Sequence, residues 1–112
     1  MKGAQEENLA LAYLQARDMQ LVTRNFRCKG GELDLVMREK ETLVIVEVRK
    51  RGNPNFGTAA ESVDGRKQAR IILAAQNFLA SRAEFARSPV RFDVVAMDGA
   101  NRIEWLKAAF DA

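Results

Sequence analysis

Two acidic residues interrupt a β-hairpin that is otherwise largely apolar, and this feature constrains the fold of the chain most strongly. Residues 32–38 and 42–49 both have the composition of strands, and a short polar turn separates them. The second strand is almost entirely apolar apart from Glu47. Such a strand is typically buried on both faces in the centre of a sheet. We therefore expect a central sheet with helices on its faces.

The turn of this hairpin predicts which side chains meet across it. If the turn is centred between residues 40 and 41, Asp34 lies opposite Glu47 and Glu32 lies opposite Arg49. Opposed side chains share one face of a sheet, with Cβ atoms about 4.5–5.5 Å apart. Glu47 and Arg49 also share a face, because they are two residues apart on one strand. The sequence thus predicts that Asp34, Glu47 and Arg49 lie together.

Two buried carboxylates at this spacing need compensation. Like charges about 5 Å apart repel by roughly 3 kcal/mol at an effective dielectric near 20, and burial adds a desolvation cost. A small domain has only about 5–15 kcal/mol of net stability. A divalent cation, a shared proton or a basic neighbour would each relieve the repulsion. In the last case, Asp34 and Glu47 are ordinary partners of Arg49, Arg24 or Arg91.

A metal ion held by Asp34 and Glu47 would define a hydrolytic site. Ligands that are all oxygen select Mg²⁺ or Mn²⁺ over softer metals. Such an ion polarises a phosphodiester and lowers the pKa of an attacking water, and Arg49 would stabilise the developing phosphorane charge. The chain has no histidine, which excludes serine–histidine and cysteine–histidine catalysis and histidine-rich zinc sites.

Composition predicts a single reduced cytoplasmic domain spanning residues 1–112. One cysteine, Cys28, cannot form an intrachain disulfide. No apolar run approaches the roughly 20 residues that cross a bilayer, so we expect no membrane segment. The net charge of +3 is compatible with an acidic partner such as nucleic acid.

The remaining periodicities complete a predicted order of α-β-β-β-α-β-β in a mixed sheet. Asp64 or Ser62 is expected to cap the longest helix. The segments outside the hairpin are predicted as a helix at 5–17, a strand at 20–27, a loop at 50–61, a helix at 64–82, a strand at 90–97, a short strand at 103–105 and a frayed helical tail at 106–112.

Two more acidic residues are candidates for the site or for its surroundings. Glu7 borders the apolar stripe of the first helix and would point into the site from above; the alternative is a solvated glutamate near a helix N-terminus. Asp93 lies inside a strand, where a salt bridge to Arg91 or Arg66 is the expected role.

Several basic residues and one aromatic residue are candidates for binding nucleic acid. Lys50 and Arg51 begin the loop, and Lys67 and Arg70 begin the long helix. They would contact phosphates, or they are solvated surface charges. Phe56 would stack on a base or wedge into a duplex; alternatively, it anchors the loop on the core.

The combined motifs resemble the YraN-like family of uncharacterised bacterial proteins over nearly the whole chain. The residues that carry the resemblance are Gly31-Glu32-Leu33-Asp34-Leu35, Val46-Glu47-Val48-Arg49, Phe56-Gly57 with Ala60, Ser62, Val63 and Lys67, Arg91-Phe92-Asp93-Val94-Val95-Ala96, and the spacing of Glu7, Ala10, Tyr13 and Leu14.

That family is similar to the Holliday-junction resolvases and restriction enzymes of the PD-(D/E)xK nuclease superfamily. The resemblance implies an α/β restriction endonuclease-like core with Asp34 as the first metal ligand. It implies Glu47 as the second ligand, with help from the Val48 carbonyl. Arg49 would occupy the place of the usual catalytic lysine, and Glu7 would match the resolvases' glutamate in helix one.

The sequence departs from the superfamily pattern at two positions. Arginine stands at Arg49 and cannot act as a general base, because it stays protonated. Leu33-Asp34 replaces the proline-aspartate pair that names the motif.

The expected function is a Mg²⁺- or Mn²⁺-dependent endonuclease that acts on branched or structured DNA. Symmetric cutting of two strands would require a homodimer. Two alternatives stay open at this point, a nucleic-acid-binding module that has lost catalysis and a protein-interaction domain.

Overall fold

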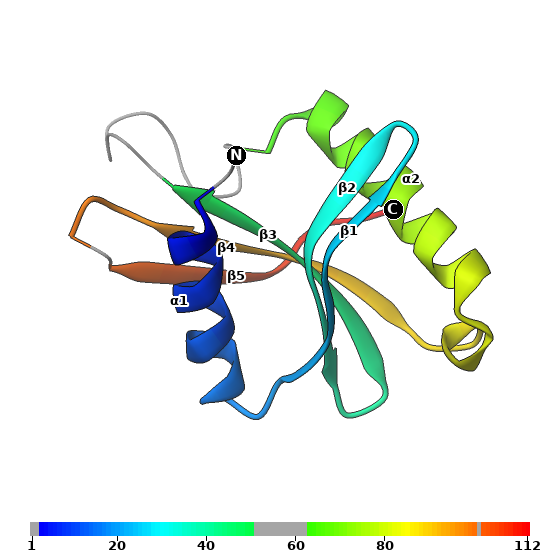
Figure 1. The fold of residues 1–112 in the computed structure, drawn as a ribbon, viewed down its shortest axis with the longest axis horizontal. Coiled ribbons are helices and arrows are strands. Elements are labelled where there is room, and N and C mark those ends of the chain that lie inside the picture. The colour runs from blue at the N-terminus through cyan, green and yellow to red at the C-terminus, as the bar shows by residue number, and fades with distance from the viewer. Residues whose placement is uncertain (1–2, 51–62, 101) are drawn as a thin grey trace.

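A five-stranded mixed sheet forms the centre of the structure (Figure 1), a computed structural model that describes residues 3–50, 63–100 and 102–112. The strands lie in the order β1-β2-β3-β4-β5, and β3 and β4 are parallel while the other neighbours are antiparallel. The predicted α-β-β-β-α-β-β order is confirmed. The elements are α1 (Ala4–Gln15), β1 (Gln20–Cys28), β2 (Gly31–Glu39), β3 (Thr42–Lys50), α2 (Gly65–Ser81), the short 3-10 helix η2 (Ala83–Phe85), β4 (Val90–Met97) and β5 (Ile103–Phe110).

Strand β3 is the buried centre of the sheet, as its apolar run predicts. Val44, Val46 and Val48 belong to the core cluster under α1, whereas Leu43 and Ile45 belong to the cluster under α2. Alternate residues of a strand point to opposite faces, so the two helices cover opposite sides of the sheet. Neither of the described α-helices is long and apolar enough to cross a membrane.

Helix α2 begins where the sequence predicts a cap. The Asp64 carboxylate accepts a hydrogen bond from the Lys67 backbone N–H at 2.9 Å, which satisfies an amide that the helix itself leaves without a partner. The alternative cap, Ser62, lies outside the described residues. The cap fixes the first turn of α2 and therefore the point from which the Lys67 side chain leaves the helix.

The paired strands β1 and β2 bend near their middle. Leu35 belongs to the cluster under α1, but Leu33, only two residues earlier, belongs to the cluster under α2. On the neighbouring strand, Asn25 has a φ of 56°, in the left-handed region that asparagine tolerates better than most residues. The bend turns the hairpin tip onto α2, where the Phe26 and Phe78 rings meet edge to face with centroids 5.3 Å apart.

A glycine permits the close contact between this tip and α2. A Cβ atom placed on Gly31 would lie 2.5 Å from the Arg70 carbonyl oxygen and 3.3 Å from the Ala74 Cβ. The helix backbone cannot move aside without disturbing its own hydrogen bonds. The tip can therefore rest on α2 only because residue 31 has no side chain.

We expect Gly31→Ala to lower the free energy of unfolding by about 1–3 kcal/mol, the usual cost of overpacking. Urea denaturation measures the change. Gly65→Ala is the matched control, because no atom lies within 4 Å of a Cβ built at that helix start. Equal losses in the two variants would contradict the contact.

The end of the chain corrects one prediction. Residues 106–112 are predicted as a helical tail, but β5 extends to Phe110. Ala108, with a φ of 51°, lies where the register of β5 against β4 shifts, and beyond it the Phe110 ring stacks on Phe92 with centroids 5.1 Å apart. The helix-favouring composition of this segment is overridden, because burial of Phe110 against the sheet is a tertiary gain that local propensity does not contain.

Asp93 is completely buried and fulfils the structural role that the sequence predicts. Its carboxylate accepts hydrogen bonds from Arg91 Nε and Nη2 at 2.9 and 3.0 Å, from the Trp105 indole at 2.9 Å and from the Ala108 backbone N–H at 2.9 Å. Of the two predicted partners, Arg91 is therefore confirmed. Trp105 and Ala108 belong to β5, so their two hydrogen bonds tie β5 to β4.

Arg91 also donates a hydrogen bond to Glu39 at 2.9 Å, and this bond holds the pKa of the Glu39 carboxyl below its usual range. A lowered folded pKa means that the stabilisation is complete above the unfolded pKa of about 4.3 and is lost as the pH falls through the folded pKa.

We therefore expect Glu39→Gln to be less stable than the unmodified chain at pH 6 and to approach it as the solution is acidified. Urea unfolding at several pH values between 6 and 3 measures this difference. A difference independent of pH would rule out the charge of Glu39 as its origin.

Candidate functional site

Strands β2 and β3 pair at the hairpin turn and then separate. Their ladder follows the predicted register, from Glu39 opposite Thr42 to Leu35 opposite Val46. Beyond this point β2 continues against β1 as far as Gly31, whereas β3 continues against β4. Figure 1 shows the β1–β2 hairpin turning toward α2 while β3 runs away from it. We call the place where β2 and β3 separate the fork.

The fork corrects the predicted pairing of the acidic residues. The ladder ends at Leu35, so neither Asp34 with Glu47 nor Glu32 with Arg49 is a ladder pair. Glu32 instead lies opposite Arg27 on β1 and forms an ion pair with it at 3.3 Å. The prediction is wrong because it extends a straight ladder through the bend of β1 and β2.

Asp34 nevertheless contacts β3 at the fork. The side chain is 2% exposed, and its Oδ2 accepts a hydrogen bond from the Val48 backbone N–H at 2.9 Å. The carboxylate thus binds an amide of β3 at the place where the β2 ladder no longer reaches it. Because Val48 follows Glu47 directly, this bond fixes Asp34 beside the second acidic residue.

Glu47 is 3% exposed and faces α2. Its Oε1 lies 3.7 Å from the Lys67 Nζ. The sequence predicts Lys67 as a phosphate-binding residue and does not pair it with Glu47. No local pattern signals this pair, because it depends on how α2 packs on the sheet. The structure therefore places an ammonium group, from a different element than Arg49, at the acidic site.

Glu7 is buried on the α1 side of the fork. It is 3% exposed, and Arg24 Nη2 lies 3.5 Å from its Oε1. The alternative of a solvated glutamate is therefore wrong. Glu7 lines a cavity of about 270 Å³ together with Arg49 and Lys50 at the end of β3. The structure thus brings Glu7 and Arg49 to one cavity.

A divalent ion at the fork would depend on few protein ligands. The described residues contain no group of three or more acidic, cysteine or histidine side chains arranged to hold a metal. Mg²⁺ usually keeps several waters and binds one or two carboxylates. Asp34 and Glu47 offer only carboxylate oxygens, and this donor chemistry matches that preference.

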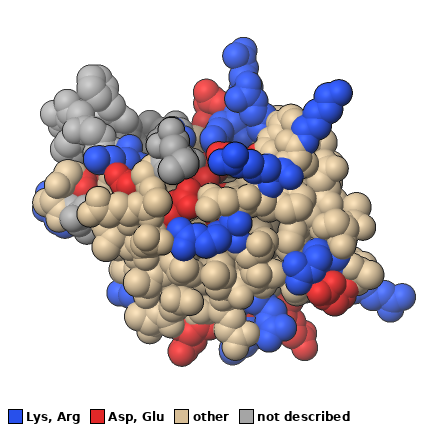
Figure 2. Space-filling view, viewed as in Figure 1, with Lys and Arg blue, Asp and Glu red and all other residues tan. Residues whose placement is uncertain are grey.

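The predicted nucleic-acid-binding residues fall into three places. Arg51 and Phe56 lie outside the described residues. Lys50 Nζ lies 3.4 Å from the Glu6 carboxylate. Lys67 and Arg70 line a cleft of about 540 Å³ against the tip of the β1–β2 hairpin. Figure 2 shows lysine and arginine side chains gathered at this end of the molecule.

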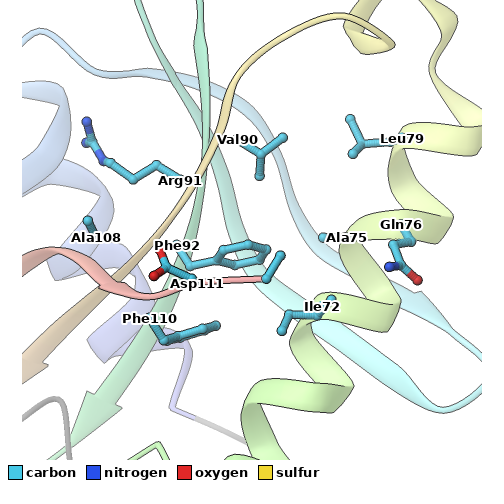
Figure 3. A pocket seen from close by; sticks show the side chains of 11 residues that line it. Ile72, Ala75, Gln76, Leu79, Val90, Arg91, Phe92, Ala108, Phe110 and Asp111 are labelled. Carbon is cyan, nitrogen blue, oxygen red and sulfur yellow. The ribbon is translucent and has the colours of Figure 1, made fainter.

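A separate cavity of about 240 Å³ lies between α2 and the paired ends of β4 and β5. Figure 3 shows the Phe92 and Phe110 rings along one side, with Ile72 and Leu79 of α2 opposite. Of the predicted site residues that the structure describes, none lines this cavity. Its mainly apolar walls do not suit phosphodiester chemistry.

The fold and the fork define an α/β protein with two buried carboxylates where neighbouring strands separate. The family model of UPF0102, an uncharacterised protein family, matches residues 6–97. A UPF0102 protein of Pseudomonas putida strain F1 is 51% identical over 113 residues, which cover 97% of this chain and 92% of the relative. A UPF0102 protein of Cupriavidus taiwanensis is 53% identical over 112 residues, which cover 99% of this chain and 83% of the relative.

This chain belongs to the UPF0102 family. The predicted membership of an uncharacterised bacterial family is thereby confirmed. The family's description names no activity, so any function has to be argued from the site.

Proposed function

We propose that this protein is a Mg²⁺- or Mn²⁺-dependent endonuclease that hydrolyses phosphodiester bonds in branched or structured DNA. The observation that carries the proposal is the fork, where Asp34 binds the backbone amide next to Glu47. Both carboxylates are buried there, and Lys67, whose Nζ lies 3.7 Å from Glu47, also lines a basic cleft.

The comparison with Asp93 supports a functional reading of the fork. The fold satisfies Asp93 with a guanidinium, an indole and a backbone amide, and so uses it to join two strands. Asp34 and Glu47 lie instead where two strands part, and Lys67 connects Glu47 to the cleft. The partly exposed Lys67 side chain therefore links Glu47 to a cleft that a ligand can enter, whereas Asp93 is enclosed by its partners.

Different residues of the site would have different roles in hydrolysis. A divalent ion bound by Asp34 and Glu47 would supply Lewis acidity and an activated water. Arg49 stays protonated and would stabilise negative charge on the phosphate. Lys67 can both orient Glu47 and exchange a proton with solvent, which makes it a better proton-transfer group than Arg49. Cutting both strands symmetrically would require two copies of the chain.

A second candidate is a nucleic-acid-binding module that has lost catalysis. The ion pairs of Glu7 with Arg24 and of Glu47 with Lys67 favour it, because they balance acidic side chains without a metal. Arginine at the place of the usual lysine also favours it.

We expect the unmodified chain to cut a four-way DNA junction in the presence of Mg²⁺ or Mn²⁺. Asp34→Asn should lower the rate at least about 10-fold, because changing even the residues that support a metal ligand typically costs about 10- to 100-fold, and it should leave DNA binding intact. Gel analysis of labelled junctions measures both. Asp111→Asn is the control, because Asp111 is an exposed acidic residue near the C-terminus and is not a predicted site residue. Binding without cutting across metals and substrates would favour the inactive module.

Metal binding can be tested without activity. Mg²⁺ or Mn²⁺ should raise the melting temperature of the unmodified chain, since a ligand that binds only the folded state stabilises it. Glu47→Gln should abolish most of that rise. Calorimetry with and without metal gives the comparison, and an equal rise in both proteins would refute the assignment of Glu47 as a ligand.

A further inference from the structure

The proposed role of Asp34 and Glu47 as metal ligands does not account for the cleft between the hairpin tip and α2. This cleft has a volume of about 540 Å³. We propose that it binds a single strand of DNA that leads into the fork, and that the protein therefore prefers DNA with a single-stranded segment beside a duplex. This inference rests on the proposed function and names its substrate class.

The charges in the cleft suit a phosphate backbone. Arg27, Lys67 and Arg70 face it together with one carboxylate, Glu32, so three cations and one anion leave a net charge of +2. Glu32 is paired with Arg27 at 3.3 Å, but these side chains are 43% and 71% exposed. Exposed ion pairs are weak, so Arg27 can turn to a phosphate at little cost.

The shape of the cleft favours one strand over two. Gly30 and Gly31 present main chain rather than side chains along one wall, and Gly31 touches α2 at the base. Cys28 and Ile71 supply apolar surface on which a base can rest. The volume lies in the range of about 300–1,000 Å³ that is usual for small-molecule pockets, which suits a short piece of one strand and not a duplex.

Lys67 links the cleft to Glu47 at the fork. The same side chain lines the cleft and places its Nζ 3.7 Å from Glu47. A phosphate held by Lys67 would therefore be next to the carboxylates, and the adjoining phosphates of that strand would lie along Arg70 and Arg27. In Figure 2, lysine and arginine side chains gather over the start of α2 and the hairpin tip.

The test measures binding in a full-length Asp34→Asn chain, so that cutting does not interfere. Fluorescence anisotropy compares a duplex carrying a single-stranded overhang with a blunt duplex of equal length, over a range of salt concentrations. We expect the overhang duplex to bind at least about 5-fold more tightly. Adding Arg27→Gln and Arg70→Gln should remove this preference and lower the salt slope by about 1.4, which is about 0.7 for each single-strand phosphate contact.

The matched control adds Arg87→Gln and Arg102→Gln, two exposed arginines that do not line the cleft. It should retain the preference for the overhang. Melting temperatures verify that the variants fold. Equal affinity for both DNAs, or equal loss in the cleft and control variants, would overturn the single-strand cleft and leave the endonuclease proposal to the cleavage assay. Absence of cleavage with the preference intact would overturn the endonuclease and keep the cleft.

Discussion

The hydrogen bond from the Val48 amide to the Asp34 carboxylate, 2.9 Å long, is the contact on which the arrangement of the site depends. A central strand that is buried on both faces cannot leave its amides without partners at modest cost. Where β2 turns away from β3, a side chain of β2 replaces the lost ladder partner. The divergence of β2 from β3 thus has two consequences. Asp34 lies beside Glu47, and a cleft lies beside α2.

The buried acidic residues of the sheet lie in two kinds of environment. Asp93 is enclosed and receives four hydrogen bonds, so its charge is used to join β4 and β5. Asp34 and Glu47 lie where β2 and β3 separate, and the partly exposed Lys67 places a cation 3.7 Å from Glu47. Burial alone does not tell these two arrangements apart, since Asp34, Glu47 and Asp93 are all buried. The arrangements differ in whether the residue joins neighbouring strands, as Asp93 does, or lies where two strands separate, as Asp34 does.

Local patterns predict most of the fold because they act over a few residues. The polar turn and the apolar run of β3 are sufficient to predict the β2–β3 hairpin and its register from Leu35 to Glu39. The fork was not predictable, because it follows from the left-handed backbone at Asn25 and from the packing of the hairpin tip on α2. The Lys67–Glu47 pair and the extension of β5 to Phe110 likewise depend on contacts between distant segments.

The bulge at Ala108 has a consequence for how the molecule meets its neighbours. Strands β1 and β5 are the two edges of the described sheet, and each carries a break in register. The Ala108 amide turns inward to Asp93, so a docking strand would find this donor already occupied. Irregular edges of this kind resist the sheet-to-sheet association that leads to aggregation. The carboxylate that secures the last strand thereby also helps to keep separate molecules from merging their sheets.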